Sequence, residues 1–223
     1  MIDSRQKQLL KAIIEQYIET GQPVGSAALA EEASINLSPA TIRNEMMALE
    51  QLGLVGQPFT SAGRVPTIKG WKYYIDSLMD LEQAEEEANS LMSRVREQSN
   101  LKELALYVST ITDGAVLVGK GDYRFVTGLG RLFAQPEFED LERIVSLSSL
   151  VDDLDSLFDR LEILAENEPQ IFIGRGNPFG SFCSTFLVSK GQAEPTIFSL
   201  VTPLCTNYPR NISIMQEAIK FLN

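Results

Sequence analysis

The sequence predicts an α+β protein in which a small, mainly helical N-terminal part precedes a domain built on a largely antiparallel sheet. Two observations lead to this fold class. Apolar residues recur at helical spacing through most of residues 1–95, whereas short runs rich in Val, Ile, Phe and Thr, bounded by Gly, Pro or Asn, follow after residue 114. With 223 residues, 44% of them apolar, the chain has enough material for one large domain or two small ones.

The N-terminal part begins with an amphipathic helix from Ser4 to Thr20, which Gly21 and the following proline end. Ser26 is expected to cap a second, short helix through Leu29 and Ala33. A polar turn over residues 34–37 then leads to a third helix.

The third helix has the clearest start signal in the chain. Ser38 is the expected N-cap, Pro39 occupies the first helical position, and Gly53 lies just past the end. The apolar stripe of this helix is expected to comprise Ile42, Met46, Leu49 and Leu52, with Thr41, Arg43 and Asn44 on other faces.

A small hairpin is predicted next. Residues 54–57 form the outgoing strand, 58–63 the tip, and Arg64 and Val65 the returning strand. Pro66 and Thr67 then open a helix that runs to about residue 78. The order helix, helix, helix, hairpin, helix is that of a winged helix-turn-helix, which we assign to residues 1–76.

In this fold, the N-terminal part of the third helix enters the major groove of double-stranded DNA, where short polar and cationic side chains reach base edges and phosphates. Arginine suits guanine and asparagine suits adenine. Candidate DNA-binding residues are therefore Ser38, Ala40, Thr41, Arg43 and Asn44 on the helix, and Thr60, Ser61, Arg64 and Lys69 in and after the hairpin. The alternatives are a solvated helix face and an ordinary hairpin loop with one surface arginine.

The charge distribution is compatible with this site, although the net charge of −11 opposes DNA binding. Residues 1–80 carry seven Lys or Arg against nine Asp or Glu, so most of the negative charge lies in the remainder. Between Gln51 and Ile75 there is no acidic residue, yet Arg64, Lys69 and Lys72 are present. A local basic strip therefore lies within an acidic protein.

Composition argues against catalysis and cofactors. The chain has no histidine, and Cys183 and Cys205 lie far apart without a metal-binding spacing, so no catalytic residue, cofactor or disulfide is expected. Asp152, Asp153, Asp155 and Asp159 are expected to favour a helix start over a metal ion. No segment reaches the roughly 18 apolar residues of a membrane span, so we expect a cytoplasmic protein without membrane contact.

A connecting helix is predicted over residues 77–100, with Leu81, Ala84, Ala88, Leu91 and Val95 at alternating spacings of three and four. This pattern spans only two heptads. It favours a helix packed on its own protomer over an intersubunit helix, which remains the alternative.

The domain over 101–223 has five predicted strands, two helical stretches between the second and third strands, and a last helix that Ser213 is expected to cap. The strands are 115–118, 123–127, 170–173, 185–188 and 196–201, and the helical stretches are 136–148 and 150–165. The GxG elements at 119–121 and 174–176 lack the rest of a phosphate-binding motif and are expected to be turns.

Four motifs mark the N-terminal part: GQPVGS (21–26), LSPATIRN (37–44), LEQLG (49–53) and QPFTSAGRVPT (57–67). Through these motifs it closely resembles the HrcA family of bacterial heat-shock repressors. The resemblance implies a homodimeric transcriptional repressor that binds an inverted-repeat operator, called CIRCE, upstream of chaperone operons. It also implies that the chaperonin modulates the repressor.

The C-terminal half resembles the family more loosely, through GLGRLFAQPEF (128–138) and the stretch from Ile173 to Asn177. The resemblance implies a GAF-like domain there. The family's inserted dimerisation domain is missing between the strands 115–118 and 123–127, and its motif GPTRMDY is replaced by VTPLCTNY (201–208). Alternative functions are a GAF-type small-molecule-sensing regulator and a winged helix used for protein contacts.

Overall fold

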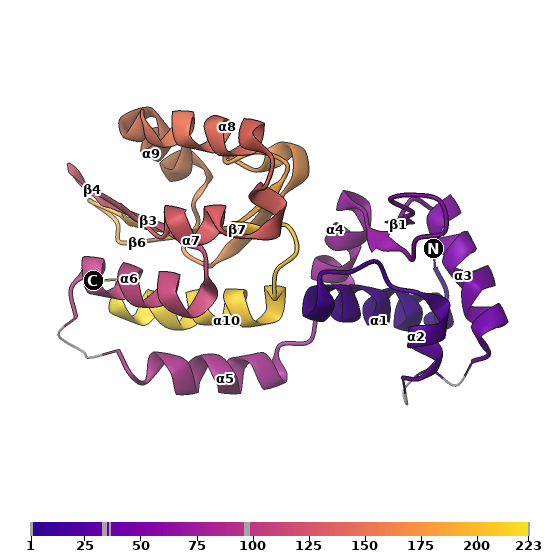
Figure 1. The fold of residues 1–223 in the computed structure, drawn as a ribbon. Coiled ribbons are helices and arrows are strands. Elements are labelled where there is room, and N and C mark those ends of the chain that lie inside the picture. The colour runs from indigo at the N-terminus through magenta and orange to yellow at the C-terminus, as the bar shows by residue number, and fades with distance from the viewer. Residues whose placement is uncertain (1, 33–34, 36, 96–98, 223) are drawn as a thin grey trace. The chain divides into compact units, whose positions relative to one another are not determined.

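The computed structural model describes residues 2–32, 35, 37–95 and 99–222 (Figure 1). The chain divides into two units, Met1–Met79 and Asp80–Asn223. Ala33, Ser34 and Asn36 of the predicted second helix and turn lie outside the described residues, as do 96–98 of the predicted connecting helix. Among the described residues, no helix is long and apolar enough to cross a membrane.

The first unit has the predicted order of three helices, a hairpin and a further helix (Figure 1). Asp3 caps the first helix by accepting a hydrogen bond from the Gln6 amide at 2.8 Å. The elements are α1 (Ser4–Thr20), α2 (Ser26–Ala30), α3 (Pro39–Gln51), β1 (Val55–Gly56), β2 (Val65–Pro66) and α4 (Ile68–Ser77).

Two details of the prediction for this unit were wrong. Gly25, not Ser26, is the N-cap of α2, and it provides no side-chain hydrogen bond. Leu52 is 42% exposed and does not extend the buried stripe of α3, because the helix has already ended there and the chain turns away. The buried core instead draws on Leu9, Leu10, Ile13 and Ile14 of α1, Ile42, Met46 and Leu49 of α3, and Trp71 and Tyr74 of α4.

The second unit is built on a five-stranded antiparallel sheet with the order β4-β3-β7-β6-β5. This result confirms the predicted α+β class. The first two strands form a hairpin in which Lys120 pairs with Tyr123, so Gly121 and Asp122 alone make the turn. The strands are β3 (Ala115–Lys120), β4 (Tyr123–Thr127), β5 (Gln170–Ile173), β6 (Cys183–Lys190) and β7 (Thr196–Pro203).

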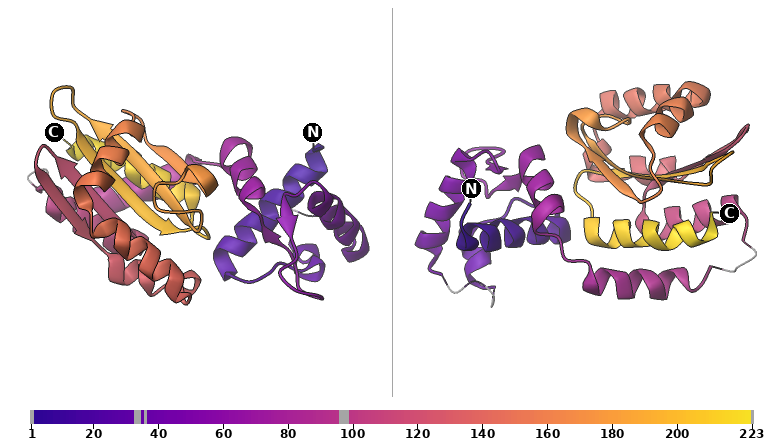
Figure 2. Two further views of the ribbon diagram at one scale, coloured as in Figure 1. Left: turned by 90° about the horizontal axis from the view of Figure 1, so that it is seen from above. Right: turned by 180° about the vertical axis from the view of Figure 1, so that it is seen from behind.

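Helices cover both faces of this sheet (Figures 1 and 2). On one face lie α6 (Leu101–Thr112) and α10 (Tyr208–Ala218), and on the other lie α7 (Leu129–Phe133), α8 (Leu141–Val151) and α9 (Leu154–Leu164). Because both faces are covered, every residue of β7 is buried. The helices α6 and α7 were not predicted. The predicted helix 136–148 begins only at Leu141, because the chain first forms a separate 3₁₀ turn, Pro136–Phe138.

The last helix, α10, starts earlier than predicted. Asn207 is its N-cap and accepts a hydrogen bond from the Arg210 amide at 3.1 Å. Ser213, the predicted cap, lies inside the helix and is buried. Proline at position 209 fits the first turn of a helix, so Asn207 and Pro209 together were the start signal.

The helix α5 (Glu82–Met92) is shorter than the predicted connecting helix and packs within the second unit, against α10 (Figure 1). Ala84, Ala88 and Met92 are buried. Glu87 of α5 forms an ion pair with Arg210 of α10 at 2.9 Å. Of the two alternatives left by the sequence, these contacts match a helix packed on its own protomer.

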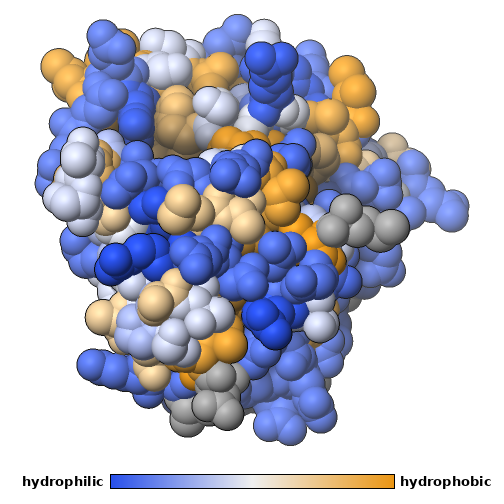
Figure 3. Space-filling model, turned by 90° about the vertical axis from the view of Figure 1, so that its right-hand side faces the viewer, coloured by the Kyte–Doolittle hydropathy of each residue, from blue (hydrophilic) through white to orange (hydrophobic). Residues whose placement is uncertain are grey.

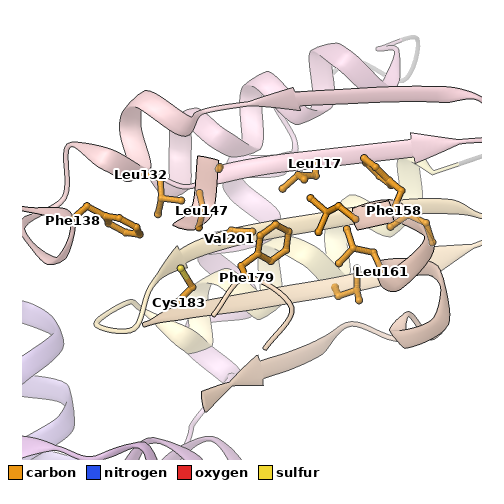
Figure 4. Packing of buried hydrophobic residues seen from close by; sticks show 13 residues of the cluster. Leu117, Leu132, Phe138, Leu147, Phe158, Leu161, Phe179, Cys183 and Val201 are labelled. Carbon is orange, nitrogen blue, oxygen red and sulfur yellow. The ribbon is translucent and has the colours of Figure 1, made fainter. Parts of the chain in front are cut away.

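Figure 4 shows the apolar core between the sheet and the helices α7 to α9. Leu117 and Val201 project from the sheet toward Leu132, Phe138, Leu147, Phe158 and Leu161. Cys183 belongs to this core, and burial raises the pKa of its thiol to about 12. It therefore stays protonated and packs as a small apolar side chain.

Gly70 is the position in the first unit that tolerates a larger side chain least. A Cβ atom at this position would overlap the carbonyl oxygen of Leu54, which belongs to rigid backbone. Gly70→Ala is therefore expected to lower the free energy of unfolding of this unit by at least about 2 kcal/mol. Trp71 is the single tryptophan, so denaturant unfolding followed by its fluorescence reports on this unit.

Gly56→Ala is the matched control. Its added Cβ would meet only the Thr67 methyl group at 3.8 Å, an ordinary contact. We expect unfolding to be unchanged or stabilised by less than about 1 kcal/mol. Equal stability of the two variants would show that α4 can move away from Leu54 at little cost.

Candidate nucleic-acid interface

The N-terminus of α3 is held by the two predicted site residues Ser38 and Thr41. The Thr41 amide donates to the Ser38 hydroxyl at 3.2 Å, and the two hydroxyl oxygens lie 2.9 Å apart. Ser38 was predicted as the N-cap, and this assignment is confirmed. Because both hydroxyl groups serve the cap, their first role is to fix the start of the helix, whose positive dipole end attracts phosphate.

One face of α3 is exposed over two turns. Ala40, Arg43, Asn44 and Met47 are spaced by three and four residues, so they lie on the same side of the helix, and all four are exposed. The side chains of Arg43 and Asn44 make no hydrogen bond or ion pair with any residue that the structure describes. Their polar groups are therefore available to a ligand.

The hairpin between β1 and β2, residues 57–64, forms a wing with a fixed loop. Gln57 Nε2 donates to the Ala62 carbonyl at 3.0 Å, and the Ala62 amide donates to the Phe59 carbonyl at 3.0 Å. Ser61 has a positive φ of 69° and donates its hydroxyl to the Thr60 carbonyl. The predicted site residues Thr60 and Ser61 are both exposed at this tip.

A cavity of about 470 Å³ lies between the start of α2, the exposed face of α3 and the wing. Among the residues that line it are Ser26, Arg43, Gln57, Ser61 and Arg64. The fold thus brings Arg43 and Ser61 to one concave surface, although 18 positions separate them in the sequence.

Arg64 is less accessible than predicted. Its guanidinium forms an ion pair with the Glu50 carboxylate of α3 at 2.8 Å, and the side chain is 14% exposed. The Arg64 backbone exchanges two hydrogen bonds with Val24, at 2.8 and 2.9 Å. The residue therefore joins the wing both to α3 and to the segment before α2.

Lys69 also has a partner inside the unit. Its Nζ donates to the carbonyl of Leu52, the C-cap residue of α3, at 2.8 Å. The C-terminal end of α3 carries unpaired carbonyls and a negative dipole, so a cation here stabilises the helix. The groups of α3 that Arg64 and Lys69 bind thus lie at its C-terminal end, about 20 Å from its N-cap.

Gly63 allows a close approach between the wing and the segment before α2. A Cβ at Gly63 would overlap the backbone of Pro23 and Val24, so the glycine permits the wing to pack on its own unit. Two exposed residues were missed by the sequence analysis, Met47 of α3 and Phe59 of the wing, which is 66% exposed. An aromatic residue within a hairpin tip was the available signal for Phe59.

Figure 3 views the molecule from the side on which α3 lies in Figure 1. Hydrophilic side chains predominate on this face, and apolar ones lie among them. A polar face with few apolar contacts is typical of DNA-binding surfaces.

The second unit offers less for a site. No cluster of three potential metal ligands occurs among the described residues. Asp153 caps α9 by accepting from the Ser156 amide at 3.2 Å. Of the two GxG elements, 174–176 forms a 3₁₀ turn, whereas Gly119 and Lys120 end β3 and only Gly121 lies in a turn. A cavity of about 120 Å³ beside Arg124, Phe158 and Glu162 is smaller than pockets for drug-sized ligands, so it gives little support to a sensor of such molecules.

The altered segment 201–208 has a structural role. Burial raises the pKa of the Tyr208 phenol above its ordinary value. The phenol donates to the Leu204 carbonyl at 2.8 Å and lies 2.5 Å from the Ser184 hydroxyl.

The side chain of Asn177 forms hydrogen bonds with Phe172, Cys183 and Thr185 at 2.7–2.9 Å and thereby holds the loop between β5 and β6.

Comparison with known proteins identifies both units. The family model described as winged helix-turn-helix transcription repressor, HrcA DNA-binding, matches residues 1–77. The family model described as HrcA protein C terminal domain matches residues 76–212.

Individual relatives are similar to parts of the chain. The heat-inducible transcription repressor HrcA of Desulforudis audaxviator is 46% identical over 104 residues, which are 47% of this chain and 30% of that protein. The proteins of the same name from Lachnoclostridium phytofermentans and Thermobifida fusca are 40% identical over 126 residues and 55% identical over 78. These two matches span 55% and 35% of this chain, and 36% and 23% of the relatives.

A solved crystal structure of a hypothetical protein has the same fold. Its TM-score is 0.84, and the match covers 100% of this chain and 98% of that one at 21% identity. The relatives above are named as transcription repressors, a class of protein that is not enzymatic. Because the two family models together match nearly the whole sequence, the chain belongs to the HrcA family.

Proposed function

We propose that this protein is a sequence-specific transcriptional repressor whose first unit reads DNA through α3 and the wing. The observation that carries the proposal is the exposed face of α3, on which Arg43 and Asn44 have no partner among the described residues, beside a concave surface shared with the wing. The repressor name of the relatives supports the same function.

We assign the reading of base edges to three residues on the exposed face of α3. Arg43 pairs with O6 and N7 of guanine, and Asn44 pairs with N6 and N7 of adenine. Ala40 lies one turn before Asn44 on the same face, and its small side chain lets the helix approach a base pair closely or contact a thymine methyl group. Ser38, Thr41, Thr60 and Ser61 supply hydroxyl groups for the flanking phosphates.

Arg64 and Lys69 act differently in this proposal. Each already binds a group of α3, so they position the helix and the wing relative to each other instead of neutralising a phosphate. This role replaces the direct DNA contacts that the sequence predicted for them.

We propose further that two copies bind an inverted-repeat operator of the CIRCE type upstream of chaperone operons. A two-fold operator presents two half-sites about one helical turn apart or a multiple of it, so a homodimer gains from binding both. The heat-inducible regulation named for the relatives and the family resemblance support control by the chaperonin.

Arg43→Ala and Asn44→Ala should each weaken binding to the operator by about 1–3 kcal/mol, because each removes one bidentate base contact. Binding to random DNA should change much less. The operator DNA is an inverted repeat that the wild-type protein selects from a random duplex library. Electrophoretic shift assays at fixed salt measure the affinities for this operator and for random DNA. Gln51→Ala, an exposed change at the other end of α3, is the control. Equal losses on both DNAs would refute base readout.

Arg64→Ala and Glu50→Gln should both lower operator affinity several-fold, because each breaks the ion pair that positions the wing. The slope of log affinity against log salt should change by much less than about 0.9, the value for one lost phosphate contact. Titrations at several salt concentrations measure the slope. If Arg64→Ala alone flattened the slope by about 0.9, and Glu50→Gln kept full affinity, Arg64 would bind a phosphate as the sequence predicted.

A duplex with the full inverted repeat should bind two protomers, and one with a single half-site should bind one protomer more weakly. The gain in affinity arises because, once one recognition helix of the dimer is bound, the second is held near the other half-site at a high effective concentration. Analytical ultracentrifugation with both duplexes gives the stoichiometry. A single protomer on the full repeat at saturation would contradict the dimer.

A further inference from the structure

The side chain of Phe59 is highly exposed, and this exposure does not stabilise the first unit. It is 66% exposed at the tip of the wing, more than any other large apolar side chain that the structure describes in residues 2–79. A phenyl group in water loses the favourable transfer free energy that burial would give. An aromatic side chain in this position is therefore suited to being covered by a partner.

The wing holds Phe59 in a defined position. The Phe59 carbonyl accepts the Ala62 amide at 3.0 Å, and Gln57 closes the loop across it. At its base, the wing packs through Gly63 on the backbone of Val24, and the Arg64 backbone pairs with the same residue. The loop that carries Phe59 is thus fixed to the body of the unit.

The surroundings favour DNA as the partner that covers this side chain. No acidic residue occurs between Gln51 and Ile75, so the wing does not repel phosphates. The wing residue Ser61 also lines the concave surface that Arg43 of α3 lines. A duplex whose major groove receives α3 therefore has its backbone and next groove within reach of the wing.

We propose that Phe59 enters the minor groove beside the half-site read by α3, where it packs on the deoxyribose walls and wedges against the base edges. This inference rests on the proposed function. A phenyl ring has no hydrogen-bonding group and gains nothing from phosphates, but inserted apolar wedges are an established mode of minor-groove binding. Since guanine places an amino group in that groove, the contact favours A·T pairs at this position.

The first test compares Phe59→Ala and Phe59→Leu on the selected inverted repeat. Phe59→Ala should lower affinity about tenfold, which corresponds to losing most of the apolar burial of one side chain, and Phe59→Leu should restore part of it. The salt slope should stay unchanged, because no charge is lost. Leu141→Ala removes an equally exposed apolar side chain, 70% exposed in the second unit, and should have no effect.

A second test locates the contact in the groove. Replacing adenine by 2,6-diaminopurine adds an amino group to the minor groove and leaves the major-groove edge of the pair unchanged. Scanned through the A·T pairs flanking the half-site, this replacement should weaken wild-type binding at one or two positions. Phe59→Ala should no longer respond at those positions.

The outcomes separate this inference from the proposed function. Wild-type protein that selects no DNA sequence would overturn both. Selective wild-type binding with no effect of Phe59→Ala, or with an effect but no diaminopurine-sensitive position, would overturn the minor-groove contact alone. A Phe59→Ala change in sedimentation without a change in DNA affinity would assign the side chain to protein contacts. Trp71 fluorescence should show unchanged unfolding of Phe59→Ala, which excludes misfolding as the cause of lost affinity.

Discussion

The carbonyl groups at the end of α3 accept hydrogen bonds from the start of α4, and the arrangement of the first unit depends on this contact. The Leu52 carbonyl accepts from Lys69 at 2.8 Å, and the Gly53 carbonyl from the Thr67 hydroxyl at 2.7 Å. The Leu54 carbonyl accepts from the Thr67 amide at 3.1 Å. Gly70 lets the two segments lie close enough for these bonds, because any side chain would overlap Leu54. Carbonyls left unpaired at a helix end would otherwise cost free energy, so the contact fixes α3 on α4.

This attachment leaves the opposite end of α3 available for the DNA recognition proposed above. The cap formed by Ser38 and Thr41 sets the start of the helix through contacts within its own first turn. Beyond the cap, Ala40, Arg43 and Asn44 are exposed. The wing is fixed to the same helix through Arg64 and Glu50, and to the segment before α2 through Val24. A helix and a wing joined in this way present their side chains as one rigid surface, which reduces the entropy lost on binding.

Local signals predicted most elements, and tertiary contacts decided the rest. Ser38, Pro39 and Gly53 marked α3 because caps act within one turn of the chain. Asn207 marks α10 in the same manner, but Ser213 was chosen although it lies in the buried interior of that helix. For the candidate site, exposure of Arg43 and Asn44 followed from helical periodicity. The partners of Arg64 and Lys69 are 14 and 17 positions away, and spacing within one element gives no information about such pairs.

The uneven distribution of charge sets how such a protein would discriminate among DNA sequences. Residues 1–79 carry seven Lys or Arg against eight Asp or Glu, whereas residues 80–223 carry twelve against twenty-two. The acidic second unit repels DNA at low salt, and two of the first unit's cations are engaged with α3. Little phosphate neutralisation remains to support binding to arbitrary DNA. In the proposed repressor, affinity therefore comes mainly from base contacts and groove shape, which differ between sequences. A weak electrostatic contribution then raises the ratio of specific to non-specific binding.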